Sequence, residues 1–184
     1  MKIGVYVGSF NPPHKGHIKI VKHLLNKKIV DKILIIPTNN YWNKTNIIDL
    51  KHRLNMLNFF KTENIIINDT LNNLEYTYQI LRELNKDNNE YSLILGADNI
   101  TTFNKWKNYQ ELLNYELLII NRDNINIKEQ LNKLNKKDKY KIIDIKNIDI
   151  SSTYIRNNIN NEKLIKNIID KQVLEYIKKE KLYS

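Results

Sequence analysis

Short apolar runs alternate along the chain with segments whose apolar residues recur every three or four positions. The runs are rich in β-branched residues, and several end at Gly or Pro, which is typical of buried strands. They cover residues 2–7, 32–36, 65–67, 92–95, 117–120 and 140–145. Helical spacing is expected between them, over residues 16–26, 50–60, 76–84, 108–114 and, more weakly, 127–134. This order predicts βαβ units that build an open parallel α/β sheet with helices on both faces.

The last part of the chain, residues 150–184, has the spacing of helices rather than strands. Val173, Leu174 and Ile177 form its clearest apolar stripe. No Gly/Ser-rich linker or internal repeat divides the 184 residues, and one hydrophobic core can serve a chain of this length. We therefore expect a single domain over residues 1–184, with residues 150–184 as its C-terminal helical part.

The composition excludes several classes of protein. The apolar runs are far shorter than the roughly 18 residues that cross a bilayer, and residues 1–7 have the wrong flanks for a signal peptide. The chain has no cysteine, which excludes a disulfide framework, a zinc ribbon and thiol catalysis. We expect a cytoplasmic protein with no membrane partner.

The formal net charge of +10 would ordinarily indicate a nucleic-acid partner. However, 26 of the 30 basic residues are Lys, and they are scattered along the chain rather than gathered in one stripe. Scattered lysines are typical of a solvated surface. We expect no nucleic-acid partner, and a non-catalytic nucleic-acid-binding protein is kept as an alternative.

Lys, Asn and Ile dominate the chain, as in proteins encoded by A/T-rich sequences. The residues that such a bias removes therefore indicate positions where the structure requires them. They include Gly8, Gly16, Gly96, Pro12, Pro13, the single Ala97, and the arginines Arg53, Arg82, Arg122 and Arg156. Gly8 and Gly96 each follow a predicted strand, and open α/β sheets bind ligands at the carboxyl ends of their strands.

The segment GSFNPPHKGH, residues 8–17, joins the first strand to the first helix. Gly8 and Ser9 allow a ligand to approach the backbone closely, and the helix N-terminus that follows is an anion site. His14 and His17 lie three positions apart and can both donate hydrogen bonds to such an anion. A chance pair on a surface turn is the simpler alternative. A metal pair is disfavoured because no third ligand is fixed nearby.

The segment ISSTYIR, residues 150–156, has a second anion-binding pattern. Ser151 or Ser152 can cap a helix, and the scarce Arg156 offers a planar fork that suits phosphate oxygens. An ordinary capped helix with a surface arginine is the alternative.

Taken together, these motifs resemble those of a known superfamily. GSFNPPHKGH resembles the GxFxPxHxGH signature of the nucleotidylyltransferases, and ISSTYIR resembles their ISSTxIR motif. The segment LGADNITTFNKWKNYQELL, residues 95–113, is similar to the GAD…W segment of bacterial nicotinate-nucleotide adenylyltransferases. Smaller similarities lie at HRLNML (52–57), EYT (75–77) and VLEYI (173–177), so that the resemblance thins only between residues 123 and 147. Class I aminoacyl-tRNA synthetases share the HxGH-type motif, but their KMSKS-like loop is not visible here.

The resemblance implies a Rossmann-like fold and transfer of the adenylyl group of ATP to nicotinate mononucleotide. The products would be deamido-NAD and pyrophosphate, in NAD biosynthesis. ATP and the mononucleotide would be the partners, with Mg²⁺ bound through the ATP phosphates rather than by protein side chains. Nicotinamide mononucleotide and phosphopantetheine stay open as alternative acceptors.

The resemblance also implies a role for individual residues. The catalytic residues would be His14, His17 and Arg156. The residues that bind ATP would be Gly8, Ser9, Phe10, His17, Lys44, Ser152 and Arg156. The residues that bind the mononucleotide would be Thr77, Gly96, Asp98, Trp106 and Lys107. These assignments require the two ends of the chain to meet at one polyphosphate.

Two of these interpretations keep a simpler alternative or an open point. The Trp106 ring can stack on a pyridine, but it can also belong to the hydrophobic core. Two positions depart from the bacterial pattern: Asn11 replaces the usual Asp, and residues 40–44 (NYWNK) replace a PPHK loop. The role of Lys44 and the discrimination between nicotinate and nicotinamide are therefore open, as is assembly into a homo-oligomer.

Overall fold

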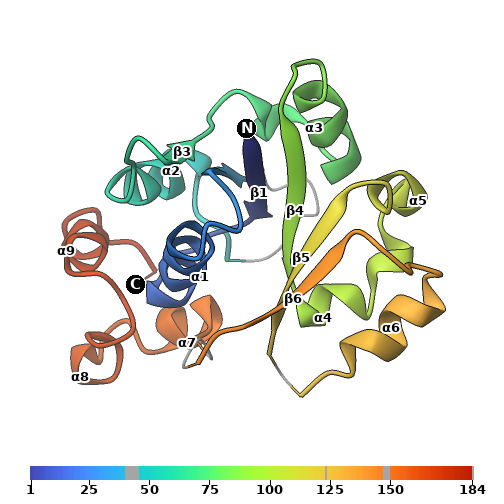
Figure 1. Cartoon of the computed structure of the whole chain (residues 1–184). Coiled ribbons are helices and arrows are strands. Elements are labelled where there is room, and N and C mark those ends of the chain that lie inside the picture. The colour runs from blue at the N-terminus through green and yellow to red at the C-terminus, as the bar shows by residue number, and fades with distance from the viewer. Residues whose placement is uncertain (40–45, 123, 147–149, 184) are drawn as a thin grey trace.

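One all-parallel sheet forms the centre of the computed structural model, which describes residues 1–39, 46–122, 124–146 and 150–183. Its strands are β1 (Lys2–Gly8), β2 (Lys32–Pro37), β3 (Ile65–Ile67), β4 (Glu90–Gly96), β5 (Glu116–Asn121) and β6 (Tyr140–Asp144). The spatial order is β3-β2-β1-β4-β5-β6 (Figure 1). The order reverses between β1 and β4, where Val5 lies opposite Leu34 on one side and Leu93 on the other. In such sheets the crevice for a ligand opens at the carboxyl ends of these two strands.

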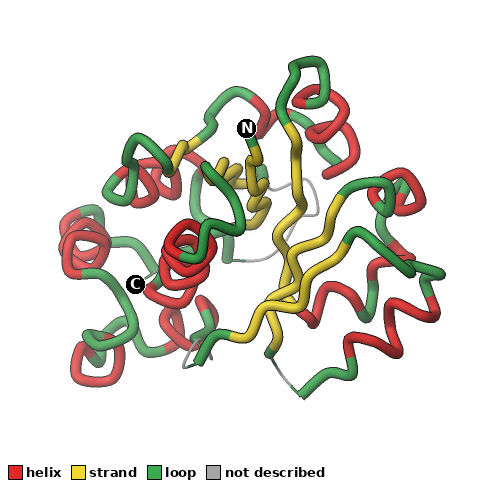
Figure 2. The backbone as a smooth tube through the Cα atoms, in the orientation of Figure 1, coloured by secondary structure: helices red, strands yellow, loops and turns green. Residues whose placement is uncertain are grey.

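Helices surround the sheet, which Figure 2 shows in the centre of the molecule. They are α1 (Lys15–Asn26), α2 (Leu50–Asn58), α3 (Thr77–Leu84), α4 (Ala97–Ile100), α5 (Tyr109–Leu112), α6 (Ile127–Lys133), α7 (Ser152–Asn157), α8 (Glu162–Ile165) and α9 (Lys171–Lys179), with 3₁₀ turns at Leu71–Asn73 and Phe103–Lys105. Apolar residues of α1 and α2 cover one face of the sheet, and those of α3 to α6 cover the other. The predicted fold class, a Rossmann-like parallel sheet with helices on both faces, is confirmed.

The three C-terminal helices pack on α2 rather than directly on the sheet. Met56 of α2 lies in one apolar cluster with Ile155 of α7, Ile165 of α8 and Val173 of α9. In Figure 1 these helices lie on the same side as α1. This packing holds the ISSTYIR segment close to the start of α1, which is the position that the predicted site needs.

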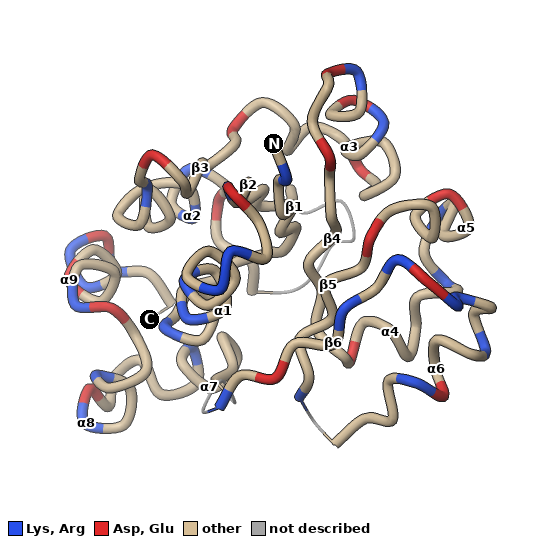
Figure 3. The backbone as a smooth tube through the Cα atoms, viewed as in Figure 1, with Lys and Arg blue, Asp and Glu red and all other residues tan. Residues whose placement is uncertain are grey.

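Lys and Arg lie on nearly every element, as the coloured backbone in Figure 3 shows. On α1 the exposed Lys15, Lys19 and Lys22 share one face of the helix. None of the described helices is both long enough and apolar enough to cross a membrane.

Candidate active site

Two adjoining cavities open at the carboxyl ends of β1 and β4. The first has a volume of about 430 Å³ and the second about 260 Å³. Both are lined by Val7, Gly8, Ser9, Asn99 and Trp106. The first cavity is further lined by Thr38, Asn39, Glu75, Tyr76, Thr77, Lys105, Lys107 and Leu112. The second is further lined by residues that include Phe10, His17, Gly96, Arg122 and Ser152. Two ligands bound side by side would therefore meet at Gly8, Ser9 and Trp106.

Phe10 belongs to the loop between β1 and α1, and its side chain points into the core. Phe10 is buried and has a φ of 46°, a left-handed conformation that is uncommon for a bulky residue. Its ring packs edge-on against Tyr6 and His17, with ring centroids 5.2 and 5.0 Å apart. A Cβ at Gly8 would lie 3.3 Å from this ring. Phe10 thus supports His17 from below and also lines the second cavity.

The two histidines of the loop stack on each other, with ring centroids 3.6 Å apart. The backbone N–H of His14 donates to Nδ1 of His17 over 3.2 Å. Because Nδ1 accepts, a neutral His17 ring carries its proton on Nε2. His17 lines the second cavity and therefore offers this site one N–H donor in a fixed orientation.

Both imidazoles are neutral at neutral pH in the ligand-free protein. Burial lowers the pKa of His14 to about 4. Burial also holds the pKa of His17 well below its usual range, and the neighbouring His14 and Arg122 add to the effect. Nδ1 of His14 is buried and has no hydrogen-bond partner among the described residues. A buried polar atom without a partner is costly, and a bound anion close to the pair would favour protonation of an imidazole.

The C-terminal motif contacts the histidine loop directly. Ser151 caps α7 by accepting a hydrogen bond from the Tyr154 N–H. Ser152 donates from Oγ to the Pro12 carbonyl over 2.9 Å, and Arg156 donates from Nη1 to the Asn11 carbonyl over 2.8 Å. The two ends of the chain therefore meet, as predicted.

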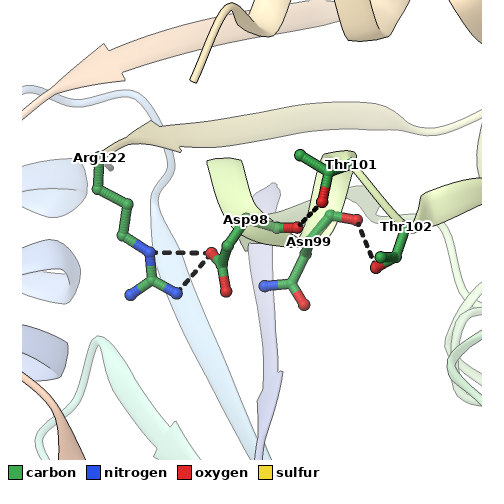
Figure 4. Close-up of polar contacts among 5 residues, drawn as sticks. All are labelled: Asp98, Asn99, Thr101, Thr102 and Arg122. Atoms are coloured by element: carbon green, nitrogen blue, oxygen red, sulfur yellow. Dashed lines mark hydrogen bonds and ion pairs between the residues drawn. The ribbon is translucent and has the colours of Figure 1, made fainter. Parts of the chain in front are cut away.

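The end of β4 carries a charged pair, shown in Figure 4. Arg122, directly after β5, donates from Nε and Nη2 to Oδ1 of Asp98 over 2.9 and 2.5 Å. A Cβ at Gly96 would lie 2.3 Å from that oxygen and 2.8 Å from Nε of Arg122. Gly96 is therefore the residue that makes room for the pair, of which Arg122 lines the second cavity.

Trp106 lies where the two cavities join. Its ring is tilted on Phe103, with centroids 5.2 Å apart, and it is half-buried. It therefore packs on the core and also faces both cavities. Thr77, the first residue of α3, and Lys107 line the first cavity with it.

Most of the predicted site residues line one of the two cavities. His14, Asp98 and Arg156 line neither, but each contacts a residue or loop segment that does. Lys44 and the rest of residues 40–45 lie outside the described part of the chain.

Asn99 and Arg122 line the second cavity, and neither has a role in the predicted motifs. The scarcity of arginine singled out Arg122, and Asn99 directly follows Asp98 in the GAD…W segment. Among the described residues, no group of three or more His, Asp or Glu is placed to hold a metal ion.

A parallel sheet with two cavities at its switch point, and histidines and a helix-borne arginine from opposite chain ends beside them, defines a nucleotidyltransferase. A family model described as cytidylyltransferase-like matches residues 5–158. The chain belongs to this family, within the branch of the nicotinate-nucleotide adenylyltransferases.

Curated relatives of full length support this membership. A probable nicotinate-nucleotide adenylyltransferase of Flavobacterium johnsoniae is 34% identical and matches 100% of both chains. A probable nicotinate-nucleotide adenylyltransferase of Fusobacterium nucleatum is 37% identical, and the match covers 98% of this chain and 98% of the relative. Among solved structures, the nicotinic acid mononucleotide adenylyltransferase of Plasmodium falciparum complexed with NaAD has a TM-score of 0.86 at 25% identity. That match covers 99% of this chain and 97% of the other.

Proposed function

We propose that the protein transfers the adenylyl group of ATP to nicotinate mononucleotide, forming deamido-NAD (NaAD) and pyrophosphate. The observation that carries this proposal is the pair of cavities that meet at Gly8, Ser9 and Trp106. The second cavity is lined by His17 and Ser152, which belong to the two predicted phosphate-binding motifs. The first cavity is lined by the Trp106 ring together with Thr77 and Lys107. Transfer of an adenylyl group between two bound substrates needs such a junction.

In this proposal a phosphate oxygen of the mononucleotide attacks the α-phosphorus of ATP. The bond from that phosphorus to the oxygen that bridges the α- and β-phosphates breaks, and this oxygen leaves with pyrophosphate. No covalent intermediate on the protein is required, because such transfers depend on positioning and on stabilisation of charge. Nε2 of His17 donates to a phosphate oxygen at the reacting centre, where negative charge develops. His14 stacks behind it and becomes protonated more readily once the polyphosphate is bound.

The second cavity takes the triphosphate. The backbone at Gly8 and Ser9 and the unused N–H groups of Arg156 bind its oxygens, and the ring of Phe10 packs against His17. The Ser152 hydroxyl has a single proton, so it binds a phosphate oxygen by exchanging its hydrogen bond to the Pro12 carbonyl. Arg156 keeps the loop in place through the Asn11 carbonyl and retains further donors, because its guanidinium has five N–H groups. Lys44 is assigned an assisting contact from its sequence position alone. Mg²⁺ enters with ATP as part of the substrate, bound through phosphate oxygens.

The first cavity takes the mononucleotide. The pyridine ring stacks on Trp106, and its carboxylate accepts from backbone N–H groups near Thr77 and Lys107. Lys105, Lys107 and Glu75 line this cavity, so that the two positive charges outnumber the one negative charge and favour an acid over an amide. Gly96 and Asp98 are assigned to the ribose of the mononucleotide, although Gly96 lines the second cavity and Asp98 lines neither. In this assignment the Asp98 carboxylate exchanges part of its bond with Arg122 for a ribose hydroxyl.

Two of the similar structures support this choice of substrates. The Plasmodium falciparum protein has been solved complexed with NaAD and, with a TM-score of 0.83, complexed with APC.

A coupled pyrophosphate assay with a panel of acceptors tests the proposal. The purified chain is incubated with MgATP and, separately, with nicotinate mononucleotide, nicotinamide mononucleotide or phosphopantetheine. Release is expected with the first acceptor, at a higher kcat/KM than with the second, and not with the third. Release with phosphopantetheine alone, or with none of the three, would overturn the proposal.

A further inference from the structure

Arg53 of α2 is a fully buried arginine beneath the histidine loop, with an exposed fraction of 1%. Its Nη1 donates to the carbonyls of Ser9 over 2.8 Å and of Thr38 over 2.7 Å. Its Nε donates to the Ile48 carbonyl over 3.1 Å. One side chain therefore joins the segment after β1, the segment after β2 and the start of α2.

The charge of Arg53 is balanced by carbonyl dipoles rather than by an acid. Within the described part of the chain, its hydrogen bonds go to carbonyl oxygens and it makes no ion pair. Burial lowers its pKa, and the more distant Tyr183 and Asp49 oppose this effect. A buried guanidinium without a carboxylate partner is costly, so a fold that keeps one gains from a bound anion nearby.

The residues that Arg53 holds are those that line the cavities. Ser9 lines both cavities and Thr38 lines the first. The N–H of Thr38 also donates to the Gly8 carbonyl over 2.9 Å, so that the ends of β1 and β2 are fixed to each other above Arg53. With its carbonyl held by Arg53, the Ser9 peptide cannot rotate freely, and the neighbouring N–H groups keep one direction.

Asn11 also joins the segment after β1 to the segment that precedes α2. Its Nδ2 donates to the Asn46 carbonyl over 2.7 Å, and its Oδ1 accepts from the Ile48 N–H over 3.3 Å. Oδ1 also accepts from the Tyr183 hydroxyl over 2.8 Å. An amide at this position donates and accepts at once, which a carboxylate cannot do. Arg53 therefore acts within a buried hydrogen-bonded network and not as an isolated contact.

We propose that Arg53 is a positioning residue for the nucleotide, which fixes the Gly8–Ser9 backbone and supplies from behind it a positive charge that the bound polyphosphate neutralises. This inference rests on the proposed function, because it requires a polyphosphate in the second cavity. It assigns Arg53 no contact with the substrate. The effect of its charge passes through a thin layer of buried backbone, where screening by salt is weak.

The test compares the wild type with Arg53→Lys, Arg53→Gln and the control Arg82→Gln. Arg82 lies on α3, is 60% exposed and pairs with Glu111. The readouts are the Kd of α,β-methylene-ATP by calorimetry, kcat and KM with both substrates, and the thermal midpoint with and without the analogue. Arg53→Gln is expected to weaken analogue binding about tenfold or more, because it removes the charge and part of the fork. Arg53→Lys is expected to keep more of the affinity but to lower kcat, and Arg82→Gln should match the wild type.

A purely structural Arg53 would lower the thermal midpoint and leave Kd, kcat and KM of the folded variants at wild-type values; that result overturns the proposal. Equal loss of affinity in Arg53→Lys and Arg53→Gln would overturn the role of the charge. If Arg53→Gln does not fold, Arg53→Lys is the deciding variant. A wild-type kcat in Arg53→Lys would show that the guanidinium group is not needed to position the backbone, and would overturn the proposal. Failure of the wild type itself to bind the analogue would instead remove the proposed function, and this inference with it.

Discussion

The hydroxyl of Ser152 donates a 2.9 Å hydrogen bond to the carbonyl of Pro12, which lies 140 positions earlier in the chain. Three further bonds join the same two parts: Arg156 to the Asn11 carbonyl, Tyr183 to the Asn11 side chain, and the Lys15 N–H to the Ile168 carbonyl. The start of the chain supplies the histidines and the end supplies the hydroxyl beside them. The second cavity therefore exists only when the whole chain has folded.

Replacement of His17 should abolish turnover while substrate binding survives. In the proposed function its Nε2–H is the donor at the reacting centre, and removal of one such donor typically costs about 10²–10³-fold in kcat. We expect His17→Ala to show this loss with a KM for ATP within a fewfold of the wild type, in steady-state pyrophosphate release. His23→Ala is the matched control, because His23 lies in the last turn of the same helix and lines neither cavity. An unchanged kcat in His17→Ala would remove this residue from the chemistry.

Replacement of Trp106 should affect the acceptor more than ATP. We expect Trp106→Ala to raise the KM for nicotinate mononucleotide about tenfold, through loss of ring stacking and of apolar contact area. The KM for ATP should rise much less, and Trp106→Phe should recover part of the loss. Equal increases in both KM values would assign Trp106 to packing alone, in keeping with its contact with Phe103.

A methyl group at Gly96 should disrupt the charged pair of the second cavity. The added Cβ would overlap Oδ1 of Asp98 and Nε of Arg122, so the pair has to separate. We expect Gly96→Ala to lower the free energy of unfolding by about 1–3 kcal/mol and to reduce kcat/KM. Gly4→Ala is the control for an added methyl group that does not meet the charged pair: its Cβ would lie 2.8 Å from the end of the buried Ile94 side chain, which also lines the second cavity. Similar losses of activity in both variants would contradict a specific role for Gly96.

The buried histidines should make the protein less stable in mild acid. The pKa of His14 in the fold is about 4, below the ordinary value of 6.5, so the unfolded chain takes up a proton first. Stability from the neutral ring is complete above pH 6.5 and falls as the pH drops toward 4, by up to about 3 kcal/mol. Urea unfolding from pH 8 to 4.5 should show a shallower loss in His14→Gln than in the wild type. Parallel curves for the two proteins would contradict the burial of a neutral His14.

The strands were predictable because of where they lie. Strands β1 to β5 are mainly apolar, since strands of a parallel sheet covered on both faces need apolar residues at successive positions. The edge strand β6 contains Lys141 and Asp144 and is only partly buried. The four-residue helix α4 was not predicted, because one turn is too short to show a helical period. The predicted helical stretch 150–184 is divided into three short helices, α7, α8 and α9, which form one apolar cluster with α2.

The candidate site was predictable where the motif lies within one segment, as for His14, His17 and Ser152. Relationships between segments were not predictable. Asp98 was expected to face a ribose, but in the ligand-free chain it pairs with Arg122, which lies 24 positions later. The scarcity of arginine marked Arg53 as a required residue, but its position in a polar helix gave no sign of its burial, which follows from the packing of α2. Such contacts depend on tertiary structure and leave no local pattern.

The crystal structure of the protein with bound α,β-methylene-ATP tests the central claim most directly. The claim is that imidazole from the start of the chain and hydroxyl and guanidinium groups from its end bind one polyphosphate. We predict Nε2 of His17 and Oγ of Ser152 within about 3 Å of oxygens of the same triphosphate, with Arg156 beside them. A triphosphate that contacts the His17 loop alone, or lies away from both ends, would contradict the account.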